Sequence, residues 1–228
     1  MSDAYIVRRG GGGGEGFDPN GAVLKVITST GCTVLVTGTG YSKTHQQADG
    51  FPRVGDANVT EHFFSIPASA FGTITVKATN TYGDNTKTLT VNTAGKVYEV
   101  LVSAPNIILN STFGLQSGFL NKLHLTYGEY SERDKSIRRT NSEIGVTGNI
   151  ADIPVGPYST LQITASRHAS QISTMSLEDQ DNMVLSSFYF NASGSRTVSD
   201  TIDNKYYATA KLVINSPGFY NITEIVLS

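Results

Sequence analysis

The chain has 228 residues, of which 39% are hydrophobic and 16% are charged, and its net charge is −2. A chain of this length can fold as one large or two ordinary domains, and its charge is too low for intrinsic disorder. The near-neutral balance, with a pI of about 6.1, provides no basic field for binding nucleic acid by counterion release. No apolar run approaches the roughly 18 residues that span a bilayer, so no membrane span is predicted.

Residues 1–16, MSDAYIVRRGGGGGEG, join a short β-prone run to a run of glycines. Glycines follow Arg8 and Arg9 where a signal peptide would have its apolar core, so we expect synthesis in the cytoplasm without export by that route. The glycines form a tether, whereas the apolar run would be stable as a strand added to an open sheet edge of a partner. We call residues 1–16 the assembly peptide. The residues expected to carry assembly are Tyr5, Ile6, Val7, Arg8, Arg9, Gly10 and Gly11.

Residues 17–103 form a succession of short segments in which apolar side chains alternate with Thr, Lys and Ser. This period of two is typical of half-buried strands, and turn signals recur every 8–12 residues or so, as in a small sandwich. No segment has a convincing helical period. The predicted strands are AVLKVITSTG, CTVLVTGTG, EHFFSIPA, GTITVKATNTYG, NTKTLTVNTAG and KVYEVLVS.

Residues 104–228 resume the β pattern after a break at Ala104-Pro105-Asn106. Because the strand pattern completes itself on each side of this break, we predict two domains that fold independently, at 17–103 and 104–228. The predicted strands of the second domain are NKLHLTY, NSEIGVTG, STLQITASRH, QISTMSLED, MVLSSFYFN, YYATAKLVIN and FYNITEIVLS.

The opening AYIVRRGGGGG resembles the N-termini of phage and prophage tail-associated proteins from Firmicutes hosts. The resemblance covers about fifteen residues. It implies a part of the tail or baseplate, located in the virion, and not an enzyme of metabolism.

The first domain resembles the bacterial Ig-like modules of surface and phage proteins. The resemblance is carried by Phe64-Ser65-Ile66-Pro67, by GTITVKATN at 72–80 and by KTLTV at 87–91. Ile74 stands where such modules commonly have an aromatic residue. The resemblance implies an Ig-like β-sandwich.

The second domain resembles the galactose-binding-like jelly rolls of carbohydrate-binding modules and tail fibres. The resemblance is carried by IPV at 153–155, by YSTLQITA at 158–165 and by the closing FYNITEIVL at 219–227. It implies a jelly-roll β-sandwich, while the ligand stays open because this fold serves many unrelated functions.

The sequence contains no motif of a catalytic or cofactor site. His45, His62, His124 and His168 are scattered without metal-ligand spacing, and no Gly-x-Ser-x-Gly elbow occurs. The stretch GTGYSKT at 38–44 lacks the glycine before the lysine of a phosphate loop and a helix after it, so a hairpin is expected there. We therefore predict no enzyme activity and no cofactor, and Cys32 is expected to pack as a small apolar residue.

The densest acidic cluster is EDQDN at 178–182. Asp179 and Asp181 are candidates for calcium ligands, although the cluster lacks the glycine and the distal glutamate of a calcium loop. A solvated hairpin is the favoured alternative.

The most charged stretch is EYSERDKSIRR at 129–139. Tyr and Arg are enriched in contact patches, so Tyr130, Arg133, Arg138 and Arg139 are candidates for binding a ligand or a partner. The alternative is an ordinary loop held by salt bridges.

Together these observations predict an all-β protein, with an Ig-like β-sandwich followed by a jelly-roll β-sandwich. The expected function is that of a bacteriophage virion structural protein of the tail or baseplate, anchored through its N-terminal peptide. The expected partners are other virion proteins and further copies of this chain. The alternatives are a receptor-binding fibre protein that recognises host cell-wall polysaccharide, and a capsid decoration protein.

Overall fold

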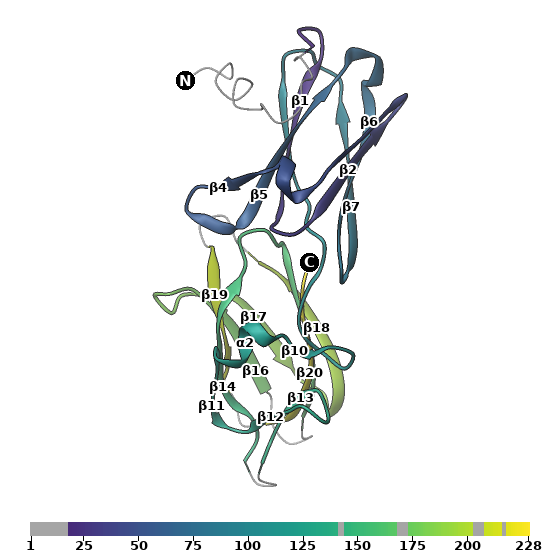
Figure 1. Cartoon of the computed structure of the whole chain (residues 1–228). Coiled ribbons are helices and arrows are strands. Elements are labelled where there is room, and N and C mark those ends of the chain that lie inside the picture. The colour runs from purple at the N-terminus through teal and green to yellow at the C-terminus, as the bar shows by residue number, and fades with distance from the viewer. Residues whose placement is uncertain (1–17, 141–143, 168–172, 203–207, 216–217) are drawn as a thin grey trace. The chain divides into compact units, whose positions relative to one another are not determined.

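A computed structural model describes residues 18–140, 144–167, 173–202, 208–215 and 218–228. The chain divides after Pro105 into two compact units, both built almost entirely from strands (Figure 1). Val102 and Ala104 are buried in the core of the first unit, so this unit extends slightly beyond the predicted boundary. The predicted all-β architecture, with an Ig-like sandwich followed by a jelly-roll sandwich, is confirmed.

The first unit is a sandwich of two four-stranded sheets, with strand orders β4-β5-β1-β8 and β3-β2-β6-β7. Its strands are β1 (Ala22–Ser29), β2 (Thr33–Gly38), β3 (Tyr41–His45), β4 (Phe51–Arg53), β5 (Asp56–Ile66), β6 (Gly72–Asn80), β7 (Gly83–Val91) and β8 (Val97–Leu101), with the short 3₁₀ helices η1 (Gln47–Asp49) and η2 (Ala68–Ala70).

Alternation along the strands places the core of the first unit between its two sheets. In β6, Ile74, Val76 and Ala78 are fully buried, while Thr75 and Lys77 between them face outward. The central strand β1 pairs with β5 in antiparallel and with β8 in parallel orientation. The first and last strands of this unit are therefore neighbours in one sheet.

The second unit pairs a sheet containing β10-β9-β20-β13-β12, joined by β15 and β18, with a five-stranded sheet β11-β14-β19-β16-β17. Its elements are β9 (Asn106–Asn110), β10 (Gly114–Leu115), α2 (Ser117–Leu120), β11 (Leu123–Tyr127), β12 (Glu129–Ser131), β13 (Ser136–Arg138), β14 (Thr147–Pro154), β15 (Thr160–Arg167), β16 (Ser173–Glu178), β17 (Val184–Phe190), β18 (Gly194–Thr201), β19 (Thr209–Ile214) and β20 (Phe219–Leu227).

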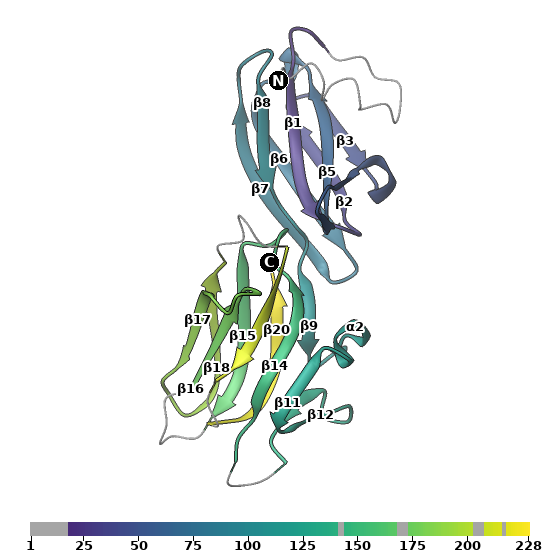
Figure 2. The ribbon, with the colours of Figure 1, turned by 90° about the vertical axis from the view of Figure 1, so that its left-hand side faces the viewer.

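The core of the second unit lies between these two sheets. Phe188 and Phe190 enter it from the five-stranded sheet, and Phe219 enters it from β20, with the rings of Phe190 and Phe219 packed edge to face at 5.0 Å. In Figure 2, β16 and β17 lie on one side of this unit and β11 and β14 lie on the other. The outer face of the five-stranded sheet therefore runs from β17 to β11.

The predicted strand NSEIGVTG is wrong over residues 144–146, and residues 141–143 lie outside the described part. The Val146 N–H donates to the Phe219 carbonyl of β20, whereas Thr147 already begins β14 in the other sheet. The segment crosses between two sheets there, so it cannot pair continuously with either. Strands β4, β9, β10, β12, β13 and β18 were not predicted, and β3 was expected only as part of the hairpin at 38–44.

Candidate functional site

The charged stretch at 129–139 folds as a hairpin in which β12 pairs with β13. Its turn is held by Ser131, whose hydroxyl donates to Asp134 Oδ2 at 2.8 Å and accepts from the Asp134 N–H at 3.2 Å. Lys135 follows with a φ of 48°, a left-handed conformation of the kind found in tight turns. Local hydrogen bonds thus fix the hairpin that positions the charged side chains.

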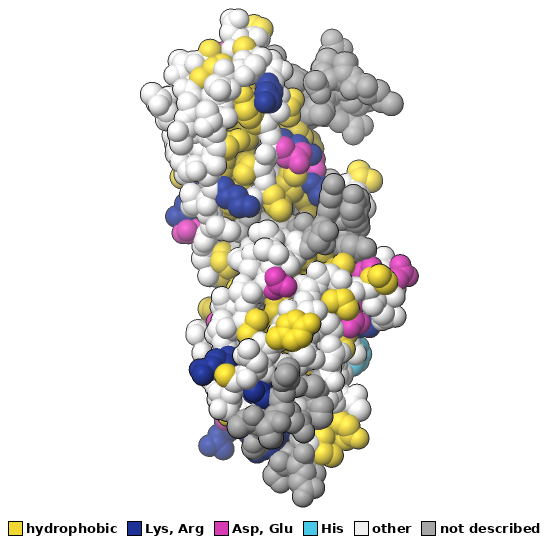
Figure 3. Space-filling model, turned by 180° about the vertical axis from the view of Figure 1, so that it is seen from behind, with side chains coloured by type: hydrophobic (Ala, Val, Ile, Leu, Met, Phe, Trp, Pro, Cys, Tyr) yellow, Lys and Arg dark blue, Asp and Glu magenta, His cyan; other side chains and the backbone are white. Residues whose placement is uncertain are grey.

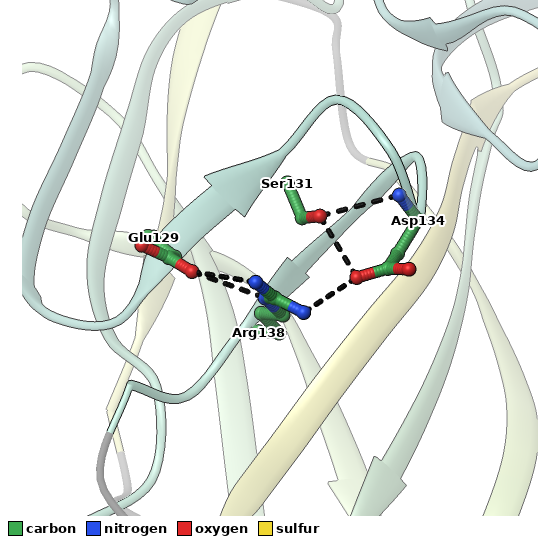
Figure 4. Close-up of polar contacts among 4 residues, drawn as sticks. All are labelled: Glu129, Ser131, Asp134 and Arg138. Atoms are coloured by element: carbon green, nitrogen blue, oxygen red, sulfur yellow. Dashed lines mark hydrogen bonds and ion pairs between the residues drawn. The ribbon is translucent and has the colours of Figure 1, made fainter.

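Arg138 is the centre of an ion-pair network within this hairpin (Figure 4). Its Nε and Nη2 lie 3.1 and 2.9 Å from Glu129 Oε1, and its Nη1 lies 2.5 Å from Asp134 Oδ2. All three side chains are between 41% and 47% exposed, so solvent screens the pairs and limits their energy. The Arg138 guanidinium is therefore paired with carboxylates of its own hairpin.

Tyr130 points toward the core of the second unit. Its hydroxyl accepts a hydrogen bond from the Leu115 N–H at 2.9 Å. Burial raises the pKa of Tyr130 above its usual value, although the hydrogen bond from Leu115 lowers it. A Cβ on Gly114, whose φ is +75°, would lie 2.4 Å from this hydroxyl. Tyr130 therefore stabilises the second unit by packing against its core and by its hydrogen bond with Leu115.

The two remaining arginines differ from each other. The Arg139 guanidinium lies over the Tyr220 ring, 5.6 Å from its centre, and the backbone N–H of Arg139 donates to the Tyr220 carbonyl. Arg133 is exposed at the turn and forms no ion pair with any described residue. Of the three predicted contact arginines, Arg133 is therefore the exposed one whose charge is not paired with a described residue.

The acidic cluster forms the turn between β16 and β17. Asp179 is buried, and its Oδ1 accepts from the N–H groups of Asp181 and Met183 at 2.9 and 2.8 Å. Asn182 completes the turn with a φ of 61° and accepts from Lys211. The carboxylate of Asp179 is thus occupied by backbone donors. The described residues contain no group of three or more His, Cys, Asp or Glu side chains placed to hold a metal ion.

The assembly residues Tyr5 to Gly11 lie outside the described residues. Cys32 is buried, with its Sγ 3.1 Å from the Ser29 hydroxyl. The GTGYSKT stretch forms the predicted hairpin, in which β2 pairs with β3. No helix in the described part of the chain is long and apolar enough to cross a membrane.

His62 is an unusual polar group in the core of the first unit. It is fully buried, and neither ring nitrogen has a hydrogen-bond partner among the described residues. Burial, with a smaller contribution from nearby His45, lowers its pKa to about 4, although Asp49 acts in the opposite direction. The two histidine rings lie 5.8 Å apart. The structure therefore holds His62 in its neutral form.

Two tyrosines that the sequence did not single out stand on the outer face of the five-stranded sheet. Tyr189 lies between the buried Phe188 and Phe190 in β17, so alternation turns it outward, and it is 62% exposed. Tyr127, at the end of β11, is 50% exposed. Neither hydroxyl forms a hydrogen bond within the described part of the chain.

Register places these tyrosines at the two ends of one row across the sheet. Tyr189 pairs with Thr174, and Tyr127 pairs with Thr147. Asn215 joins the two pairs: its N–H donates to the Thr174 carbonyl, and it stands one residue beyond the Gly148–Ile214 pair, opposite Thr147. We call Tyr189, Thr174, Asn215, Thr147 and Tyr127 the tyrosine row.

Comparison with known proteins places the chain in no family. No family model matches it, and no curated protein matches it. Solved structures that resemble it include a Bacteroides ovatus protein, SGBP-B of a mixed-linkage glucan utilization locus, in complex with a mixed-linkage heptasaccharide. That match has 12% identity and a TM-score of 0.27, and it covers 91% of this chain and 52% of the other.

A second structure is the Bacillus anthracis TIE protein, with 10% identity and a TM-score of 0.27, covering 87% of this chain and 49% of the other. The chain thus spans about half the length of each of these structures. At such TM-scores neither resemblance bears on function.

Proposed function

We propose that the protein is a non-enzymatic structural component of a bacteriophage virion, in the tail or baseplate, made in the host cytoplasm. It attaches through the assembly peptide and presents two β-sandwich units. The observation that carries this proposal is the sequence AYIVRRGGGGG, a β-prone run and a glycine tether placed ahead of the first sandwich. The described residues already supply both sheets of each sandwich, which supports a role for this peptide in assembly.

The proposed attachment is strand addition. Backbone N–H and C=O groups of Tyr5, Ile6 and Val7 would pair with an unpaired sheet edge of another virion protein or of another copy of this chain. The glycines add reach without side chains that need packing. Arg8 and Arg9 would set the charge preference of the acceptor edge.

Deletion of residues 1–16 tests this proposal. The truncated chain should unfold at nearly the same temperature as the full chain but should not be incorporated into particles. Ile6→Asp, which places a charge in the apolar run, should also prevent incorporation, whereas Gly12→Ser serves as the matched control. Normal incorporation of the truncated chain would contradict the proposal. Antibody labelling of intact particles distinguishes a tail position from capsid decoration.

A second candidate function is recognition of a host-surface glycan by the second unit. It is favoured by the tyrosine row, because exposed aromatic rings beside hydroxyl and amide groups are suited to sugar rings. The two candidates are compatible, since a tail component can also contact the host.

A further inference from the structure

We propose that the outer face of the β11-β14-β19-β16-β17 sheet binds a linear, uncharged oligosaccharide, with Tyr127 and Tyr189 as stacking platforms at its two ends. This inference deepens the glycan-recognition candidate by naming the surface and the ligand class. It concerns the isolated protein and does not depend on where the protein sits in a particle.

The two exposed tyrosine rings provide the stacking surfaces. Scattered exposed hydrophobic residues are normal on a protein surface, and Figure 3 shows hydrophobic side chains standing among largely uncharged surface over the second unit. Tyr127 and Tyr189 differ from scattered residues because strand register places them in one row. A tyrosine ring offers a flat apolar face at low cost in conformational entropy, which suits the apolar face of a pyranose.

The distance between the two rings determines how long a ligand must be to contact both. The row crosses five strands, and four inter-strand spacings correspond to about 19 Å. A single sugar ring can contact only one tyrosine over this distance. An extended oligosaccharide of several units can contact both, so affinity should rise with chain length until both rings are covered.

The side chains between the rings determine the charge of the ligand. Thr147 and Thr174 carry hydroxyl groups, and Asn215 carries an amide whose Nδ2 already donates to the Ser176 hydroxyl at 2.8 Å. Hydroxyl and amide oxygens can accept hydrogen bonds from sugar hydroxyls. None of the three carries a charge. Four residues farther along the same two strands, Glu178 and Lys211 form an ion pair at 3.6 Å and offset each other. The face therefore complements a neutral ligand.

The opposite outer face of the same sandwich differs in its exposed side chains. There the Thr164 hydroxyl donates to Glu224 Oε2 at 2.8 Å and lies 2.9 Å from the Thr197 hydroxyl. Strands β15, β18 and β20 carry no large hydrophobic side chain that is exposed, within their described residues. These three strands therefore lack stacking platforms.

The experiment uses the full chain and a panel of neutral gluco-, manno-, galacto- and N-acetylglucosamine oligosaccharides of increasing length. Binding is detected on immobilised sugars and measured by titration calorimetry. We expect at least one linear series to bind, with affinity rising with length. Tyr127→Ala and Tyr189→Ala should each weaken binding of the longest member at least tenfold, and the double variant should not bind. The Phe variants at both positions should retain binding.

The matched control is Phe113→Ala, because Phe113 is 54% exposed in the same unit but lies outside the row. It should bind like the unchanged chain, and thermal unfolding should confirm that all variants fold. The proposal is overturned if no member of the panel binds, or if the double variant binds normally. It is also overturned if the tyrosine variants impair only incorporation into particles, which would identify a protein contact. The structural proposal fails on a different result, normal incorporation of the chain lacking residues 1–16.

Discussion

The β12–β13 hairpin and the tyrosine row are both exposed surfaces of the second unit, yet their side chains are satisfied in opposite ways. In the hairpin, Arg138 contacts Glu129 and Asp134, and Tyr130 reaches back to Leu115. In the row, Tyr127 and Tyr189 turn their rings to solvent and form no hydrogen bond within the described chain. The hairpin supplies its own partners, whereas the row leaves its aromatic faces open to a ligand.

This difference shows that charge density is a poor guide to an open surface. A stretch with acids and bases close in sequence can pair them locally, as Asp134 and Arg138 do four residues apart. Exposed aromatic rings have no such local partner. A search for binding surfaces should therefore ask which side chains the fold leaves unsatisfied.

The largest expected effect at neutral pH separates Tyr130 from Tyr189. Tyr130→Ala removes a ring packed against the core and should lower the free energy of unfolding by about 2 kcal/mol or more. Tyr130→Phe removes only the hydrogen bond with Leu115 and should cost about 1 kcal/mol. Tyr189→Ala should stay within about 0.5 kcal/mol, as expected for an exposed residue. Urea unfolding measures all three, and equal losses for Tyr130→Ala and Tyr189→Ala would remove the distinction.

His62 of the first unit is a third case, because it is a buried side chain without a hydrogen-bond partner among the described residues. Its folded-state pKa of about 4 lies below the ordinary 6.5, so the unfolded chain takes up the proton first. Above about pH 6.5 the ring is neutral in both the folded and the unfolded state, so this group does not reduce the free energy of unfolding. As the pH falls from 6.5 toward 4, protonation of the unfolded chain lowers the free energy of unfolding. The loss reaches about 3 kcal/mol at pH 4.

Unfolding of the full chain, followed between pH 7 and 4.5, measures this effect. His62→Gln should reduce the acid dependence of the first unit, whereas His124→Gln, at an exposed position, should not. Because carboxylates also titrate in this range, the difference between variant and unchanged chain is the decisive quantity. An identical acid dependence in His62→Gln would show that the ring is not held neutral.

The ion pairs of the hairpin should have a smaller effect. Arg138→Ala removes contacts to two exposed carboxylates and should lower the free energy of unfolding by about 0.5–1 kcal/mol. The loss should shrink in about 1 M salt, where exposed charges are screened. Unfolding at low and high salt tests this. A loss that is independent of salt would indicate that Arg138 acts through packing.

Arg133 should have the smallest effect on stability, because it forms no ion pair with the described residues. The role of this loop as a contact surface stays a prediction, and Arg133 is the residue best placed to test it. Arg133→Glu should weaken attachment or assembly more than tenfold if the loop is a contact, without changing unfolding. Unchanged attachment by that variant would leave the hairpin as a self-contained structural element.

The alternation of apolar and polar residues was sufficient to predict the sandwiches, because burial follows it directly in strands such as β6. The same reasoning predicted the turn at Asp179. It failed for Tyr130, since a tyrosine in a charged stretch is read as exposed until the position of Leu115 is known.

The tyrosine row was beyond sequence reasoning for a different reason. The strand pairs that carry its tyrosines contain register shifts, between Leu125 and Tyr127 in the β11–β14 pair and between Leu177 and Glu178 in the β16–β17 pair. An extra residue in a strand reverses the face of the residues that follow. Which tyrosines share a face is therefore settled only when the pairing is known.

The pairing of terminal strands gives the two units different responses to tension. In the first unit, β1 and β8 run parallel, with Val23 to Ile27 aligned with Val97 to Leu101, so a pull on the unit's ends shears this ladder and loads all its bonds together. In the second unit, β9 and β20 are antiparallel, with Asn106 opposite Leu227. A pull on its ends opens that pair first and then each following one, like a zipper. In single-molecule stretching, the second unit should yield at lower force, which would let the first unit stay folded under load.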